Sequence, residues 1–283
     1  RLAIANDPDA DRLGAAIPQP DGSWRRLGGD EIGWLLADHV LRHTPGADRL
    51  VVTTLVSSSL LGKMAGADGV HFAETYTGFK WIGHTALAHP ELQFVFGYEQ
   101  ALGYLVGDRP LDKDGITAAI ALAEVAAVVA AQGHTLQQRL DEIDAHFGKH
   151  VIAERSVRMN PLDGVAAVAR LRAEPPAALA GETVTATTWF DEAGLLRFEF
   201  GSSTARGSAA TRRRSSTPLP RCSEARASGR RAELAVARVA ESGHDERGLV
   251  EPFVERRGVH GEIEAAVAQV LDALRGGEHA HHD

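Results

Sequence analysis

Three acidic residues recur at every second position near the start of the chain, in Asp7-Pro8-Asp9-Ala10-Asp11-Arg12, just after an apolar run at 2–5. A core element cannot hold this pattern, because an ionised carboxylate buried without a partner costs several kcal/mol. A strand or a tight loop points alternate side chains to one side, so Asp7, Asp9 and Asp11 can converge on one hard cation. Carboxylate oxygens of this kind suit Mg²⁺. The segment predicts a metal loop, with an exposed acidic turn as the alternative.

Size, charge and cysteine content narrow the class of protein. A chain of 283 residues is long enough for about two domains. Its formal charge of −8 argues against general nucleic-acid binding. The single cysteine, Cys222, excludes an internal disulfide and fits a reducing compartment. No apolar stretch reaches the length of a membrane span, so we expect a cytoplasmic protein without membrane contact.

Apolar β-branched runs alternate with amphipathic segments between residues 27 and 148. Strand patterns are found at 50–56, 71–75 and 92–97, and helix patterns at 31–43, 57–65, 116–132 and 136–147. Alternation at this spacing predicts an α/β domain with a mixed, mainly parallel sheet flanked by helices. We assign this domain to residues 27–148.

The two ends of the chain have different patterns. Residues 1–26, with strands expected at 1–5, 12–17 and 24–27, suggest the end of an incomplete preceding domain that carries the metal loop. Residues 149–283 suggest a smaller α+β domain, with a helix at 161–173, two strands within 182–200, and helices at 230–242 and 261–274. Residues 202–231 hold eight arginines against one acid without periodicity, which predicts an irregular or disordered segment.

Three further motifs have chemical and structural interpretations that both stay open. Gly78 and Lys80, in Thr75–Gly83, form either a turn that presents an ammonium to a phosphate or a structural strand-to-helix turn. Glu99 follows an apolar strand, where it can accept hydrogen bonds from sugar hydroxyls or simply favour a helix N-terminus. Lys113 and Asp114 precede the long helix, where Asp114 can act as its cap.

The order of these motifs resembles the α-D-phosphohexomutase superfamily, which includes phosphoglucomutases, phosphomannomutases and phosphopentomutases. The residues that carry the resemblance are Asp7–Arg12, Gly29-Asp30-Glu31, Thr77–Trp81, Gly97–Ala101 and Asp112–Gly115. Members have four domains, and the resemblance covers the end of the second and all of the third, roughly residues 1–150. Residues 151–200 resemble the start of the fourth domain more loosely.

The resemblance implies a phosphosugar mutase. In such a reaction an enzyme phosphoserine donates its phosphoryl group to a sugar monophosphate, and the resulting bisphosphate reorients and returns its other phosphate. By resemblance, Asp7, Asp9 and Asp11 hold Mg²⁺, and Arg12 and Lys113 are catalytic. The residues implied in substrate binding are Thr77, Gly78, Lys80, Glu99, Ala101 and Asp114. Many relatives have serine at the position of Ala101, so one hydroxyl contact to the sugar is expected to be missing.

Two departures from the family pattern concern the catalytic machinery. The family's catalytic serine lies ahead of the segment that this chain resembles. The fourth domain's phosphate loop, Arg-Pro-Ser-Gly-Thr-Glu-Pro, is replaced by Ser202–Arg206 and the arginine-rich stretch that follows. We interpret that stretch as a coding frameshift between about residues 200 and 222, with a basic, disordered phosphate- or RNA-binding insert as the alternative.

Three hypotheses about function follow. The first is a phosphosugar mutase of which this chain is a fragment, expected to be inactive alone because it lacks the serine and the phosphate loop. The second is a non-catalytic remnant that still binds Mg²⁺ or a phosphosugar. The third is an unrelated Mg²⁺-dependent phosphatase with Asp7 as nucleophile, which the sugar loops and Arg12 disfavour. A small phosphosugar is the expected substrate, while glucose, mannose and pentose phosphates, and the oligomeric states, are not distinguished.

Overall fold

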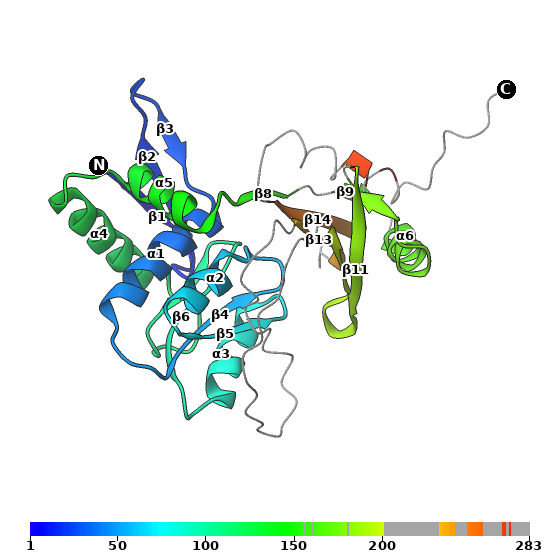
Figure 1. The fold of residues 1–283 in the computed structure, drawn as a ribbon, viewed down its shortest axis with the longest axis horizontal. Coiled ribbons are helices and arrows are strands. Elements are labelled where there is room, and N and C mark those ends of the chain that lie inside the picture. Colours follow the sequence, from blue (N-terminus) through cyan, green and yellow to red (C-terminus); the bar gives the residue numbers. More distant parts are fainter. Residues whose placement is uncertain are drawn as a thin grey trace. The chain divides into compact units, whose positions relative to one another are not determined.

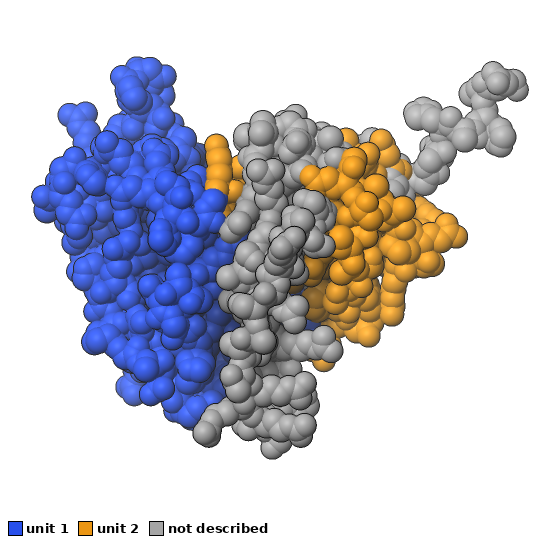
Figure 2. All heavy atoms as spheres, viewed as in Figure 1, with its two compact units in different colours: residues 1–148, 212–227 blue, residues 149–211, 228–283 orange. Residues whose placement is uncertain are grey.

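The computed structural model describes residues 1–154, 157–159, 161–179, 181–200, 232–240 and 248–256, together with the helical positions 268, 269 and 272 (Figure 1). These residues belong to two compact units that divide between Gly148 and Lys149, as the two colours of Figure 2 show. Residues 1–26 lie in the same unit as residues 27–148. The acidic loop and the sugar-binding motifs therefore share one unit.

The first unit begins with a small antiparallel sheet that carries the acidic loop. Its strands are β1 (Ala3–Asn6), β2 (Leu13–Pro18) and β3 (Trp24–Arg26), in the order β1-β2-β3. Ala3 pairs with Ala16 and Asn6 with Leu13, so residues 7–12 form the connection between two paired strands. Alternate residues of β2 are buried, as expected for a strand with one face toward the core.

The main sheet of the first unit is mixed and mainly parallel. Its strands are β4 (Arg49–Thr54), β5 (His71–Thr75), β6 (Gln93–Glu99) and β7 (Gly103–Val106), in the order β5-β4-β6-β7. The central strand β4 runs parallel to β5 and β6, and β7 runs antiparallel to β6. All six residues of β4 are buried, which is typical of a central parallel strand. The predicted fold class is confirmed.

Helices cover both faces of this sheet. They are α1 (Gly29–His43), α2 (Leu60–Ala67), α3 (Phe79–Ala88), α4 (Gly115–Ala131) and α5 (Leu136–Phe147). Helix α3 packs on one face, in a buried cluster of Leu50, Val52, Phe79, Ile82, Phe94 and Leu105. Helices α1 and α2 lie on the other face, where Gly33 approaches the ring of Tyr98 and Gly62 the ring of Phe72. Figure 1 shows α3 on the opposite side of β4 and β5 from α2.

The length and polarity of these helices bear on membrane insertion. Within the described residues no single helix is both long and apolar enough to span a membrane. In the part of the chain that the structure describes, α4 and α5 taken together meet the length and composition requirement, but they are bent by 87° at the break between them.

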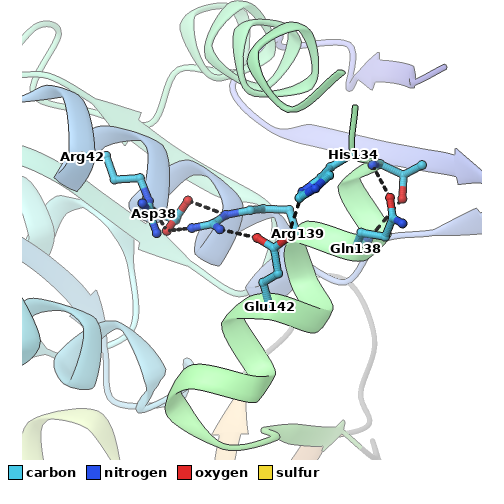
Figure 3. A network of polar contacts seen from close by, with 7 residues as sticks. Asp38, Arg42, His134, Gln138, Arg139 and Glu142 are labelled. Atoms are coloured by element: carbon cyan, nitrogen blue, oxygen red, sulfur yellow. Dashed lines mark hydrogen bonds and ion pairs between the residues drawn. The ribbon is translucent and has the colours of Figure 1, made fainter. Parts of the chain in front are cut away.

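A charged network joins α1 to α5 (Figure 3). The Arg139 guanidinium donates to both carboxylate oxygens of Asp38, at 2.9 and 2.5 Å, and to Glu142 at 2.5 Å. Arg42 donates to the same Asp38 carboxylate at 2.9 Å, and His134 lies 2.9 Å from Glu142. The side chains of Asp38 and Arg139 are only 13% and 17% exposed, so their pairing is shielded from solvent.

We expect Arg139→Met to destabilise the first unit by about 2 kcal/mol, because the shielded negative charge of Asp38 then loses its main positively charged partner. Arg42→Met is the matched control. Its side chain is 60% exposed, so the expected loss is below about 0.5 kcal/mol. Hydrogen exchange of the β4 amides reports the opening free energy of this unit. Equal losses in the two variants would contradict the assignment of Arg139 as the central cation of the network.

The second unit is an α+β arrangement built on one antiparallel sheet. Among its described residues the strands run in the order β10 (Ala178–Leu179), β11 (Glu182–Phe190), β12 (Leu195–Phe200), β13 (Ala232–Ala240), β14 (Gly248–Arg256) and β8 (Val151–Glu154), and β9 (Val157–Met159) also pairs with β14. Helix α6 (Pro161–Ala173) matches the predicted helix, and the 3-10 turn Asp191–Ala193 separates β11 from β12.

The helix predicted at 230–242 is wrong, because residues 232–240 form strand β13. The segment Ala-Glu-Leu-Ala-Val-Ala-Arg-Val-Ala is rich in helix formers, yet it pairs with β12 on one side and β14 on the other. Two neighbouring strands satisfy its backbone, and this tertiary pairing overrides local propensity. The arginine-rich segment at 202–231 lies outside the described residues, as does most of the helix predicted at 261–274.

Candidate active site

The acidic loop is closed by its own arginine. The Ala10 backbone N–H donates to the Asp7 carbonyl at 2.9 Å, which forms a tight turn. Arg12 donates to the Asp7 carboxylate twice, from its backbone N–H at 3.2 Å and from Nε at 2.9 Å. Desolvation acts to raise the pKa of the Asp7 carboxyl, but these hydrogen bonds from Arg12 outweigh it and hold the pKa below its usual value. Asp7 is therefore an ionised group at neutral pH.

Lys113 reaches the same loop from the segment that leads into α4. Its Nζ lies 2.8 Å from Oδ2 of Asp11. The hydrogen bond to Asp11 raises the pKa of the Lys113 ammonium against the opposing effect of desolvation. The second oxygen of Asp11, Oδ1, is buried, accepts no hydrogen bond within the described structure, and lies 3.6 Å from Nε of Arg12. The structure thus brings together Asp7, Asp11, Arg12 and Lys113.

The acidic loop contacts the start of α4, and the residue that follows it contacts the turn before β7. The Gly115 backbone N–H donates to the Ala10 carbonyl at 3.0 Å, and the Leu13 N–H donates to the Leu102 carbonyl at 3.0 Å. A Cβ at Gly115 would lie 2.4 Å from Nδ2 of Asn6, so only glycine allows this approach. The segments that carry the acidic loop, Lys113 and the 99–103 turn therefore meet in one place.

The acidic loop meets the requirements of a Mg²⁺ site only in part. Carboxylate oxygens suit this ion, and the buried Oδ1 of Asp11 is an oxygen without a hydrogen-bond donor. Across the described residues, however, no group of three or more His, Cys, Asp or Glu side chains is placed to hold one metal ion. The chemistry fits, but the expected convergence of Asp7, Asp9 and Asp11 is not present, because Arg12 and Lys113 pair with two of the carboxylates and Asp9 is exposed.

The loop at 76–78 connects β5 to α3. Gly78 has φ +107°, a conformation that L side chains rarely adopt, and it precedes the first residue of the helix. Its backbone N–H donates to Oε1 of Glu99 at 3.3 Å, which joins this loop to the end of β6. Lys80 is exposed, with Nζ 5.6 Å from the centroid of the Trp81 ring, and Thr77 is half-buried. The two predicted sugar loops are thus in direct contact through Gly78 and Glu99.

A buried network beneath Glu99, which the sequence did not reveal, fixes this strand end. Oδ1 of Asp30, a residue only 5% exposed, accepts hydrogen bonds from the Tyr98 hydroxyl and the Ser58 backbone N–H, both at 2.7 Å. The Gln100 backbone N–H donates to Oγ of Ser57 at 3.1 Å. The available signal was an acidic residue, Asp30, directly before the 31–43 helix pattern, together with the run Ser57–Ser59.

Two predicted substrate-binding residues have clear structural surroundings. Oδ1 of Asp114 accepts the Ile116 N–H at 2.9 Å, so Asp114 is the N-cap of α4. Ala101 is exposed in the turn between β6 and β7. Helix capping therefore explains the presence of Asp114 without a role in substrate binding. The role of Ala101 in substrate binding stays a prediction.

Together these features define an α/β domain with a cluster of charged loops beside the carboxyl ends of its parallel strands, where open sheets of this class bind ligands. Residues 28–146 match the family model described as phosphoglucomutase/phosphomannomutase, alpha/beta/alpha domain III. For the domain at residues 28–146, this match confirms the resemblance found in the sequence.

Individual relatives agree with this assignment. The chain is 39% identical over 183 residues to a probable phosphomannomutase of Haemophilus influenzae, covering 64% of this chain and 36% of that protein. It is 38% identical over 161 residues to the human phosphopentomutase, covering 53% of this chain and 26% of that protein. The chain thus spans about a third or less of the length of these curated relatives.

A solved structure supports the fold. The crystal structure of a putative phosphomannomutase from Thermus thermophilus aligns with a TM-score of 0.63 at 20% identity, covering 97% of this chain and 46% of that one. At this identity the likeness concerns the fold alone.

Proposed function

We propose that this chain supplies the sugar-reading domain and the metal loop of a phosphosugar mutase. The observation that supports this most strongly is the contact between loops that the family uses for different tasks. Asp11 is paired with Lys113, and Gly78 with Glu99, at one edge of a domain that matches the family model. The reaction class is transfer of a phosphoryl group between two oxygens of a hexose or pentose phosphate, through a phosphoserine and a sugar bisphosphate.

Each residue has a task in this proposal. Glu99 accepts hydrogen bonds from sugar hydroxyls, and the Gly78 N–H that it already binds keeps its carboxylate in place. Lys80 is exposed beside this pair, where an ammonium suits a phosphate. The Arg12 guanidinium binds a phosphoryl oxygen in a forked geometry.

Asp7, Asp9 and Asp11 are the residues that the resemblance proposes for Mg²⁺, and to hold it Asp7 and Asp11 would have to exchange their contacts with Arg12 and Lys113. When bound, the ion would polarise phosphoryl oxygens and offset developing charge. One similar fold, an Aspergillus fumigatus N-acetylphosphoglucosamine mutase with TM-score 0.52, is described as a complex with GlcNAc-6P and magnesium. For this chain, the binding of Mg²⁺ and of a phosphosugar is proposed from the chemistry of its own carboxylates and lysines. The proposed cytoplasmic location rests on the single cysteine and is a separate expectation.

The test is sugar-phosphate binding, because no residue of this chain matches the phosphoserine that turnover requires and we expect these 283 residues alone to bind without interconverting. Glucose 6-phosphate, mannose 6-phosphate and ribose 5-phosphate are titrated calorimetrically. We expect one of them to bind, and Glu99→Gln to weaken it about tenfold through loss of charged hydrogen bonds.

Glu91→Gln is the matched control, because Glu91 lies exposed before the opposite end of β6. The affinity of this variant for the sugar phosphate should stay within about twofold of the affinity of the unmodified chain. The proposal is wrong if no sugar phosphate binds, or if Glu99→Gln and Glu91→Gln have the same effect.

A further inference from the structure

Trp81 is the centre of an aromatic cluster around the start of α3. The Tyr76 ring meets it edge-on, with ring centroids 5.5 Å apart and an interplanar angle of 76°. The His84 ring meets it at 5.9 Å and 70°. The Trp81 backbone N–H donates to the Gly78 carbonyl at 3.0 Å, and its carbonyl accepts a hydrogen bond from Oγ1 of Thr85 at 2.8 Å. The half-buried indole is therefore held in place by contacts with both its ring and its backbone.

This cluster borders the contact between the two predicted sugar loops. A Cβ at Gly78 would lie 3.8 Å from Cδ1 of Trp81, so the edge of the indole lies beside this glycine. The Gly78 backbone N–H is also the group that donates to Oε1 of Glu99 at 3.3 Å. A sugar whose hydroxyls donate to the Glu99 carboxylate would therefore lie next to the Trp81 ring.

Two polar groups of the cluster are available to a ligand. Nζ of Lys80 lies 5.6 Å from the centroid of the Trp81 ring, and among the described residues no carboxylate pairs with it. In the same part of the chain, the indole N–H of Trp81 donates no hydrogen bond. A cation–π contact at an exposed site is weaker than charge-assisted hydrogen bonds to a phosphate, so a bound phosphate can draw this ammonium away from the ring.

We propose that the sugar ring stacks on the indole of Trp81, and that the Lys80 ammonium passes from this indole to the phosphate of the same ligand. The inference rests on the proposed function and assigns a further residue to the sugar site. The face of an indole ring is electron-rich, whereas the C–H bonds on one face of a sugar ring are apolar and slightly positive, so the two surfaces attract each other. Glu99 then binds the hydroxyls at the rim of the sugar, while Trp81 contacts the ring itself.

The experiment follows tryptophan emission while glucose 6-phosphate, mannose 6-phosphate and ribose 5-phosphate are added in turn to the full chain. We expect the ligand that binds to change the emission in a saturable manner, because it changes the surroundings of the Trp81 indole. Trp81→Leu should abolish this change and weaken binding about tenfold, as measured by calorimetry. Trp81→Phe keeps a smaller ring in the same place, so it should lose the emission change but only about threefold in affinity.

Trp24→Leu is the matched control, because it removes an indole of the same unit that is 50% exposed. Trp24 pairs with Pro18, at the opposite end of β2 from the acidic loop. This variant should keep the emission change and bind the sugar phosphate within about twofold of the unmodified chain.

Affinity and emission together separate the possible failures. If a sugar phosphate binds but leaves the emission of the unmodified chain unchanged, or if Trp81→Leu binds it as tightly as Trp24→Leu does, the stacking role of Trp81 is overturned and the proposed function stands. If none of the three sugar phosphates binds to the unmodified chain, the proposed function and the inference both fall.

Discussion

Gly29→Ala is expected to destabilise the first unit by about 3 kcal/mol and to abolish phosphosugar binding. A Cβ at Gly29 would lie 1.8 Å from the carbonyl oxygen of Gln100 and 2.7 Å from its carbonyl carbon. Both atoms belong to backbone, which cannot swing aside as a flexible side chain does. Either α1 or the 99–101 turn must move, and overpacking of this kind costs 1–3 kcal/mol or more.

Gly28→Ser is the control for this prediction. Residue 28 is the N-cap of α1 with φ −69°, a Cβ there would lie 3.6 Å from Oε2 of Glu31, and serine is a favourable N-cap residue. We expect a change within about 0.5 kcal/mol. The opening free energy of the β4 amides by hydrogen exchange measures both variants. A Gly29→Ala chain as stable as Gly28→Ser would show that the close approach of α1 to Gln100 is not tight.

Asp30→Ala is expected to lower the stability of the same unit by about 3 kcal/mol, because its carboxylate accepts hydrogen bonds from two buried groups, and bonds to charged groups contribute 1.5–3 kcal/mol each. One of these donors is the Tyr98 hydroxyl, and Tyr98 immediately precedes Glu99. The Tyr98 carbonyl is held separately, by Oγ1 of Thr53 at 2.9 Å. The loss should therefore loosen Glu99 without releasing β6, so sugar affinity falls along with stability.

Asp30→Asn should recover part of the stability, since the amide keeps one acceptor oxygen in the same place. Asp48→Ala is the control because that side chain is exposed, and its effect should stay within about 0.5 kcal/mol. Thermal unfolding and sugar titration are run on all three variants. If Asp30→Ala lowers stability but binds the sugar phosphate normally, the buried network supports the fold alone and does not position Glu99.

Patterns of apolar residues predicted most of the described fold. The continuous run at 50–56 predicted the central strand β4, and the long apolar segment before Gln132 predicted α4 to within one residue at each end. Strand β7 was missed because Gly103–Val106 follows directly on a turn and is only four residues long. Strand β13 was misassigned because its pairing partners β12 and β14 are distant in sequence, and local propensity carries no information about them.

The candidate site was predictable in its residues but not in its contacts. Spacing alone placed Asp7, Asp9 and Asp11 on one loop, yet it could not show that Arg12 and Lys113 pair with two of them. Lys113 is about a hundred positions away from Asp11, and the contact depends on Gly115 fitting closely against Asn6. Similarly, Asp30 supports Tyr98 across 68 positions, a relation that only the packing of α1 on β6 creates.

The most direct test of the phosphosugar site is a map of backbone amide shifts as Mg²⁺ and each of glucose 6-phosphate, mannose 6-phosphate and ribose 5-phosphate in turn are added to the full chain. With one of the three we predict saturable shifts that gather at Asp11, Gly78, Glu99 and Gly115, because these residues lie in the contacting loops, or at the strand and helix ends beside them, at one edge of the first unit. Amides of α5, which lie outside this cluster, should not respond. Shifts that gather on α5, or the absence of any saturable change at Gly78 and Glu99 with all three sugar phosphates, would contradict the phosphosugar site.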